Sequence, residues 1–225
     1  AQAIQCTEIL VSGSNLYVAT VDGIYKSADG GANWAKKSDG IFVGNGALYA
    51  FCKSIYEING LLLTGAYTGI YRSTNGGENW IATNITGMHV YANSFTLYNG
   101  ILFAARETNN PPGSYKSTDN GVTWSPFAIS GSYVPTITFY NDGSRLYAGT
   151  IVGVWLSTNN GLNWVQKNTG LSPDPYSSSI LRVNNVLITS LTAGGSDMFV
   201  SYNNGDQWLD FHQGLPFLTA INQVV

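Results

Sequence analysis

The sequence predicts an all-β fold, a β-propeller of five four-stranded antiparallel blades. The motif Ser-x-(Asp/Asn)-x-Gly-x-x-Trp occurs five times, with starts at residues 27, 73, 117, 157 and 201. Glycine is abundant, with 26 residues, and only 10% of residues are charged, a composition that suits short strands joined by tight turns. Repetition every 40 to 46 residues is typical of propeller blades, whereas nothing in a β-sandwich requires one motif to recur.

Each repeat carries the signals of four strands. An apolar segment follows a turn signal such as Asn59-Gly60, Asn99-Gly100 or Asp142-Gly143, and a further strand ends with an aromatic residue two positions before the motif serine. The motif tryptophan opens a fourth strand. We expect the first strands of the five blades to be centred on Ile9, Ile55, Phe95, Ile137 and Ile180.

The repeats predict one propeller domain over residues 1–225, with a surplus strand at its C-terminal end. The blades are expected at about 3–44, 45–88, 89–131, 132–174 and 175–216. Residues 217–225 align with the first strand of a blade, which gives six inner strands for five sets of the others. Either the ring closes with five blades and one terminal strand is displaced, or the chain is a fragment of a larger propeller. An unpaired edge strand could also mediate self-association.

The motif chemistry indicates a structural role. The third residue has a short side-chain oxygen that can accept backbone N–H groups within a turn, and asparagine does this as well as aspartate. The glycine supplies positive φ, and the tryptophan is expected to pack between blades. The motif residues are Ser27, Asp29, Gly31, Trp34, Ser73, Asn75, Gly77, Trp80, Ser117, Asp119, Gly121, Trp124, Ser157, Asn159, Gly161, Trp164, Ser201, Asn203, Gly205 and Trp208.

These motifs resemble the Asp-box, or BNR, repeats of sialidases, sortilin-type receptors, xyloglucan hydrolases and photosystem II assembly factors. The resemblance covers nearly the whole chain and implies a propeller with structural Asp-boxes. Sialidases use an arginine triad, a tyrosine nucleophile assisted by an acid and an N-terminal arginine motif. This chain has no match to that motif, and its arginines are Arg72, Arg106, Arg145 and Arg182. We therefore expect no sialidase activity.

An enzyme remains an alternative hypothesis. Glycoside cleavage requires two carboxyl groups, and four acidic residues fall in loops on one predicted face, namely Asp22, Glu107, Asp174 and Asp197. We expect these to be solvated loop acids, and we predict no catalytic residues. The two histidines, His89 and His212, have no partner at ligand spacing, so we expect no metal and no cofactor.

Aromatic residues near the predicted loop face favour a non-catalytic binding or assembly scaffold. Counting four residues back from the first-strand centres, with the surplus strand included, gives one aromatic for each step. Arg106 and Asp174 lie in longer loops on the same face. The partner would be a protein or a glycan, the latter making the chain a lectin-like propeller, although the aromatics could instead pack between blades. The predicted binding residues are Phe51, Tyr91, Tyr133, Tyr176, Phe217, Arg106 and Asp174.

Charge and hydropathy limit the other partners. The net charge is −3 and the basic residues are scattered, which argues against nucleic acid. No apolar run approaches the ~20 residues of a membrane helix, so we expect no membrane insertion. The start Ala1-Gln2-Ala3 resembles that of a bacterial secreted protein after removal of its export signal, which predicts an extracellular or periplasmic location. Cys6 and Cys52 are compatible with either redox compartment.

Overall fold

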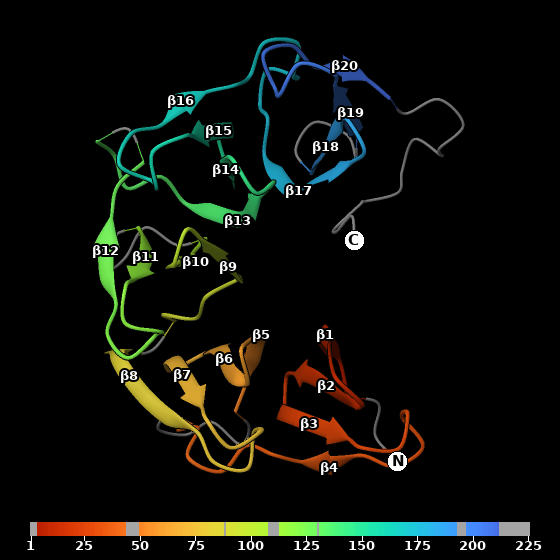
Figure 1. Ribbon diagram of the computed structural model, residues 1–225, viewed down its shortest axis with the longest axis vertical. Coiled ribbons are helices and arrows are strands. Elements are labelled where there is room, and N and C mark those ends of the chain that lie inside the picture. Colours follow the sequence, from red (N-terminus) through yellow and green to blue (C-terminus); the bar gives the residue numbers. More distant parts are fainter. Residues whose placement is uncertain are drawn as a thin grey trace. The chain divides into compact units, whose positions relative to one another are not determined.

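The computed structural model describes residues 4–43, 50–87, 89–107, 113–129, 131–192 and 197–211. These residues form five four-stranded antiparallel sheets, and in each sheet the strands follow one another in chain order (Figure 1). The predicted all-β propeller with five blades is therefore confirmed. The surplus segment 217–225 lies outside the described residues.

Each sheet corresponds to one repeat, and each fourth strand starts directly after a motif tryptophan. Blade 1 comprises β1 (Cys6–Ser12), β2 (Asn15–Thr20), β3 (Gly23–Ser27) and β4 (Ala35–Lys36); blade 2, β5 (Cys52–Ile58), β6 (Leu61–Ala66), β7 (Gly69–Ser73) and β8 (Ile81–Thr86); blade 3, β9 (Ser94–Tyr98), β10 (Ile101–Ala105), β11 (Ser114–Ser117) and β12 (Ser125–Phe127); blade 4, β13 (Thr136–Asn141), β14 (Leu146–Thr150), β15 (Gly153–Ser157) and β16 (Val165–Gln166); blade 5, β17 (Ser177–Val183), β18 (Val186–Leu191), β19 (Asp197–Ser201) and β20 (Leu209–Asp210).

The centre of one first strand differs from the prediction. Phe139 pairs with Ala148 in blade 4, at the register position where Ile55 pairs with Thr64 in blade 2. Phe139, and not Ile137, is thus the equivalent of Ile55. The cause is turn length: residues 59–60 form a two-residue turn between β5 and β6, whereas four residues, 142–145, separate β13 from β14. A count back from the turn signal therefore slips by two positions.

The chain forms two compact units, one of Ala1–Phe95 with Lys116–Ser125 and the other of Thr96–Tyr115 with Pro126–Val225. In the first unit β5 packs against β1 and β2, and in the second β17 packs against β13 and β14. The buried side chains lie mainly between such neighbouring blades. Tyr17, Ile55 and Trp80 belong to one core, and Tyr147, Ile180 and Trp208 to another.

The five motif turns share one hydrogen-bond pattern. The serine hydroxyl accepts the N–H of the motif glycine at 2.8 to 3.0 Å and donates to the third-position oxygen. That oxygen accepts the N–H of the seventh residue at 2.9 to 3.0 Å, whether it belongs to Asp or Asn. Positive φ is needed at both the fourth and the fifth position, as at Asn160 (60°) and Gly161 (73°). The turn therefore depends on hydrogen-bond acceptance and not on charge.

Four of the five motif tryptophans are buried, with at most 7% of their surface exposed. Trp80 and Trp208 donate their indole N–H at 2.8 Å to the carbonyl oxygens of Lys37 and Lys167 in the preceding blade. Trp34 is 42% exposed and donates to its own motif glycine, Gly31. The predicted packing between blades therefore does not hold for Trp34, because it belongs to the first blade of its unit and no earlier blade of that unit covers it.

Ion pairs reinforce two of the blade junctions. The sixth motif residue of blade 2, Glu78, lies 2.5 Å from Lys37 and 3.8 Å from Lys26 of blade 1. At the same motif position in blade 5, Asp206 pairs with Lys167 of blade 4. A carboxylate at the sixth motif position can therefore bind a cation of the blade before it.

Candidate binding site

Each blade has two ends with different content. The motif turn and the turn between the first and second strands lie at one end, which we call the box face. The turn between the second and third strands and the chain entering the first strand lie at the other end, which we call the loop face. Backbone bonds join the parts of the loop face, for example Tyr67 N–H to Phe51 O at 2.8 Å and Thr192 N–H to Tyr176 O at 3.0 Å.

Four rings gather on the loop face of the first unit, and we call them the aromatic cluster: Phe51, Tyr67, His89 and Tyr91. Phe51 and Tyr91 meet edge to face with ring centroids 5.8 Å apart. Tyr67 and His89 have centroids 4.5 Å apart, and the Tyr67 hydroxyl is 2.7 Å from His89 Nε2. His89 has a φ of 62°, in the left-handed region that few residues other than Gly adopt and in which Asn, Asp and His are the most frequent.

A close backbone approach holds Tyr91 in place. A Cβ atom on Gly65 of β6 would lie 2.2 Å from the carbonyl oxygen of Ala92, so only glycine permits this contact. The Ser54 hydroxyl donates to the same carbonyl oxygen at 2.7 Å. The segment that carries Tyr91 is thereby fixed against blade 2, which rigidly positions one half of the aromatic cluster.

A pocket of about 310 Å³ lies near this cluster in the chain, lined by Phe42, Thr68, Tyr71, Ala82, Thr86 and Gly87. Thr68 and Gly87 are neighbours of Tyr67 and near neighbours of His89, and Gly87 N–H donates to Thr68 O at 3.0 Å. The Thr68 hydroxyl donates to Phe42 O at 2.6 Å, so this polar group is already satisfied. Phe42 is 59% exposed. The pocket therefore presents a largely apolar lining beside the aromatic rings.

A half-buried carboxyl group joins the first strands of blades 1 and 2. Glu8 of β1 accepts the N–H of Ile55 at 2.7 Å, and burial raises the pKa of its carboxyl to about 7 against the opposing effects of this bond and Lys53. Ionisation of Glu8 thus costs the folded state more than the unfolded state.

Replacing Glu8 by glutamine is therefore expected to raise the stability above pH 7 by about 2 kcal/mol. An acid whose folded pKa is raised destabilises the fold as the pH rises from about 4.5 to 7, and glutamine removes this dependence while it can still accept the Ile55 bond. Chemical denaturation at pH 4 and pH 8 measures the effect. Equal stability changes at the two pH values would contradict the assignment.

The second unit carries a hydrogen-bonded pair on its loop face. The Tyr176 hydroxyl donates to Glu107 Oε1. Burial, together with this bond and the charge of Glu107, raises the pKa of Tyr176. A tyrosine with a raised pKa remains protonated and acts as a hydrogen-bond donor. The pair is therefore better suited to holding a polar ligand than to nucleophilic attack, which requires a lowered pKa or an adjacent base that removes the proton.

The other predicted binding residues lie in different settings. Arg106 is only 1% exposed, and its carbonyl accepts Thr136 N–H at 2.7 Å. Asp174 is exposed, and its carbonyl accepts Tyr176 N–H. Tyr133 is 48% exposed and lies against Gly113. Phe217 is outside the described residues. Because Pro135 O accepts Ile151 N–H as Phe51 O accepts Tyr67 N–H, Pro135 and not Tyr133 occupies the equivalent place in blade 4.

The four carboxylates of the enzyme hypothesis are not equivalent. Asp22 accepts hydrogen bonds from Lys36 at 2.7 Å and from Tyr25 at 2.5 Å. Burial raises the pKa of the Asp22 carboxyl, but these hydrogen bonds outweigh burial and the pKa is lowered. Glu107 is bonded to Tyr176, Asp174 is exposed, and the side chain of Asp197 is not described.

Within the described ranges, no three His, Cys, Asp or Glu residues are grouped as a metal site would require. The same part of the chain contains no helix that could span a membrane.

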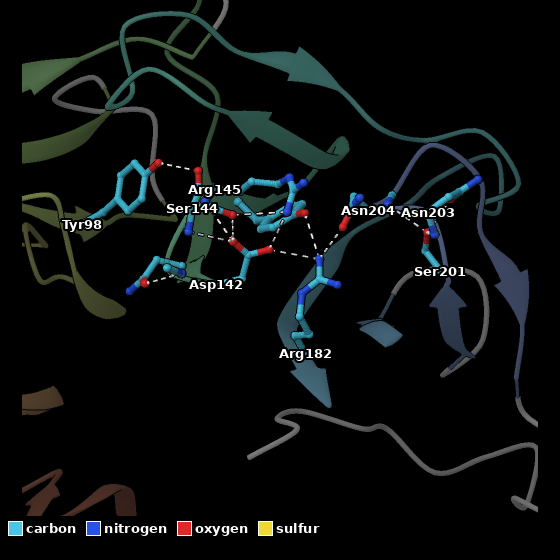
Figure 2. Close-up of polar contacts among 12 residues, drawn as sticks. Tyr98, Asp142, Ser144, Arg145, Arg182, Ser201, Asn203 and Asn204 are labelled. Atoms are coloured by element: carbon cyan, nitrogen blue, oxygen red, sulfur yellow. Dashed lines mark hydrogen bonds and ion pairs between the residues drawn. The ribbon is translucent and has the colours of Figure 1, made fainter. Parts of the chain in front are cut away.

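A buried charged network lies on the box face of the second unit (Figure 2). Asp142, with 3% of its side chain exposed, lies 3.0 Å from Arg182 and 3.4 Å from Arg145. Arg182 also donates to Asn204 at 2.9 Å, so a turn of blade 4 is connected to the motif of blade 5. Burial opposes ionisation of Asp142, yet bonds from Ser144 and the two arginines hold its pKa below the usual value. The network is therefore structural.

Sequence reasoning did not identify Tyr67 and His89 as binding residues. One signal was available: the residues at the position of Tyr67 are Val21 in blade 1 and Ile151 in blade 4, so an aromatic residue in this turn is specific to blade 2. The contact of Tyr67 with His89 has no signal in the sequence, because it joins loops 22 positions apart.

The model of the BNR/Asp-box repeat family matches residues 115–126, which include the third motif. The chain carries Asp-box repeats. The other four turns repeat the hydrogen bonds of this Asp-box. A search of curated proteins found no significant match.

Solved structures share the fold over most of the chain. An ancestral GH74 enzyme is 20% identical with a TM-score of 0.75, covering 95% of this chain and 32% of its own length. The extracellular domain of a one-component system from B. thetaiotaomicron is 13% identical with a TM-score of 0.72, and the match covers 93% of this chain and 28% of that domain's chain. YCF48 bound to D1 peptide is 16% identical with a TM-score of 0.63, covering 92% and 67%. This chain thus spans about a third of the length of the first two, and the likenesses show a propeller fold alone.

Proposed function

We propose that this Asp-box propeller is a non-catalytic binding scaffold whose protein partner contacts the loop face of the first unit. The aromatic cluster carries the proposal, because two ring pairs, Phe51–Tyr91 and Tyr67–His89, lie on this face. Gly65 and Ser54 hold the segment that carries Tyr91 in place. Large rings on a rigid support lose little conformational entropy on binding and are enriched among residues that dominate protein interfaces.

The pocket beside the cluster favours a protein over a glycan. Phe42, Tyr71 and Ala82 provide an apolar lining that suits an inserted aliphatic or aromatic side chain. The peptide bound by YCF48, a protein with a similar fold, is consistent with this class of ligand. A glycan ligand would make the chain lectin-like, and screening against both ligand classes distinguishes the two.

Replacing Phe51 and Tyr91 together by alanine is expected to lower the affinity for the partner by about 30-fold or more. This loss corresponds to at least about 2 kcal/mol of binding free energy from two aromatic residues at the centre of an interface. A displayed peptide library and a glycan array, screened with the purified chain, supply the ligand, and calorimetry measures its affinity. Circular dichroism of the double variant confirms that the fold is retained.

Tyr133→Ala is the matched control, because Tyr133 is an exposed aromatic residue in the other unit. Its binding should be unchanged. If the screens yield a specific glycan and no peptide, and the double variant no longer binds that glycan, the ligand is a sugar and not a protein. A ligand that binds the double variant as tightly as the original chain would show that the aromatic cluster is not the site.

A further inference from the structure

A second pocket, of about 350 Å³, lies on the box face of the first unit. It is lined by the β5–β6 turn (residues 58–61), by Arg72 and Thr74 of blade 2, and by Asn120 of the third Asp-box. Its polar groups include a guanidinium, a hydroxyl and two side-chain amides. The pocket is at the opposite end of blade 2 from the aromatic cluster, so a ligand bound in it would be independent of the proposed function.

Arg72 is the unusual member of this lining. Its Nε atom is buried without a hydrogen-bond partner, and among the residues that the structure describes the Arg72 side chain forms no ion pair. The Glu57 carboxylate, at the end of β5, accepts Gly60 N–H at 2.6 Å. Burying part of a cation without an anion is unfavourable, so a negatively charged group bound in the pocket would interact favourably with Arg72.

Comparison of the blades shows what is missing. Lys26 of blade 1 and Arg72 of blade 2 both directly precede an Asp-box serine. Lys26 finds Glu78, the sixth residue of the next Asp-box, at 3.8 Å. The sixth residue of the Asp-box that comes after Arg72 is Val122, which is 46% exposed and has no charge. Arg72 therefore lacks the carboxylate that its counterpart has.

We propose that this pocket binds a carboxylate side chain of a protein ligand, with Arg72 as the charged contact and Thr74 and Asn120 as polar neighbours. A guanidinium presents two parallel N–H donors that match the two oxygens of a carboxylate. The chain itself shows the preferred occupant, because Glu78 and Asp206 at other junctions are carboxylates presented by a polypeptide turn. The ligand is thus an acidic side chain on an exposed loop of another protein.

Arginine side-chain NMR tests the site directly. The chain has only four arginines, so four Nε–H signals are expected and Arg72→Lys assigns one of them. Titration with a blocked glutamate amide should move the Arg72 signal and leave the Arg106, Arg145 and Arg182 signals in place. Glucuronate and inorganic phosphate at equal ionic strength should act more weakly. Equal shifts of all four signals, no shift of Arg72, or tighter binding of glucuronate or phosphate would overturn the proposal.

Val122→Glu supplies the missing carboxylate from within the chain. The new carboxylate should form an ion pair with Arg72, as Glu78 does with Lys26, and so lower the affinity for the blocked glutamate by about tenfold or more. Ala32→Glu places the same group at the same position of the first Asp-box, in a blade that has no earlier blade in its unit, and should leave the titration unchanged. If Val122→Glu binds glutamate as well as the original chain, Arg72 is not the receptor. An equal loss in both variants would point to net charge and would also contradict the site.

Discussion

Replacing Trp80 by alanine is expected to destabilise the first unit by about 3 to 5 kcal/mol. Trp80 is 3% exposed and belongs to the core between blades 1 and 2, so its loss leaves a large cavity. The change also removes the indole N–H that binds Lys37 O at 2.8 Å and leaves this carbonyl without that donor. Urea denaturation followed by tryptophan fluorescence and circular dichroism measures the loss.

Trp34→Ala is the matched comparison, since it removes the same side chain from the same motif position. Trp34 is 42% exposed and bonds only to its own turn. We expect a loss of about 1 kcal/mol, the typical value for substitutions that do not open a buried cavity. A loss as large as that of Trp80→Ala would show that Trp34 is buried in solution.

Replacing Arg182 by alanine is expected to destabilise the second unit by about 2 to 4 kcal/mol, because a buried carboxylate loses its nearest cation. Asp142 would then retain only Arg145 Nη1 at 3.4 Å as a charged partner. The change also removes the bond to Asn204, which connects blade 4 to the Asp-box of blade 5 (Figure 2). Thermal and chemical unfolding both report the effect.

Two further variants separate the buried charge from other causes. Asp142→Asn removes the charge that Arg182 compensates, so in that background Arg182→Ala should cost clearly less. Lys36→Ala breaks the pair with Asp22, in which Lys36 is 44% exposed, and is expected to cost less than about 1 kcal/mol. Equal costs of Arg182→Ala in both backgrounds would mean that the ion pair does not stabilise the fold.

The fold was predictable because residues within each Asp-box determine the conformation of its turn. The serine, the third-position oxygen and the glycine specify the turn through local bonds, and Asn59-Gly60 specifies a tight hairpin through positive φ at both residues (51° and 80°). The register of β13 was not predictable from the turn signal alone. The Oδ1 atom of Asp142 accepts three bonds from residues 144 and 145, and these bonds form a longer turn than Asp142-Gly143 predicts.

The candidate site was predictable only in part. Phe51 and Tyr91 were found by counting back from the first strands, and the structure brings them together at 5.8 Å. Tyr133 was misplaced relative to the other blades by the same two-residue slip that affected Ile137. The Tyr67–His89 contact joins loops 22 positions apart, and the missing partner of Arg72 becomes visible only when the blades are compared in space.

The acceptors of the Trp80 and Trp208 indole groups have a consequence for how such repeats evolve. Both acceptors are main-chain carbonyl oxygens, which every residue type offers, so the identity of the preceding side chain does not restrict the donor. A duplicated or exchanged repeat can therefore keep this hydrogen bond on a new neighbour without a substitution at the acceptor position. Charged side chains such as Glu78 and Asp206 can then be gained or lost at one junction at a time, which frees individual junctions for new specificities.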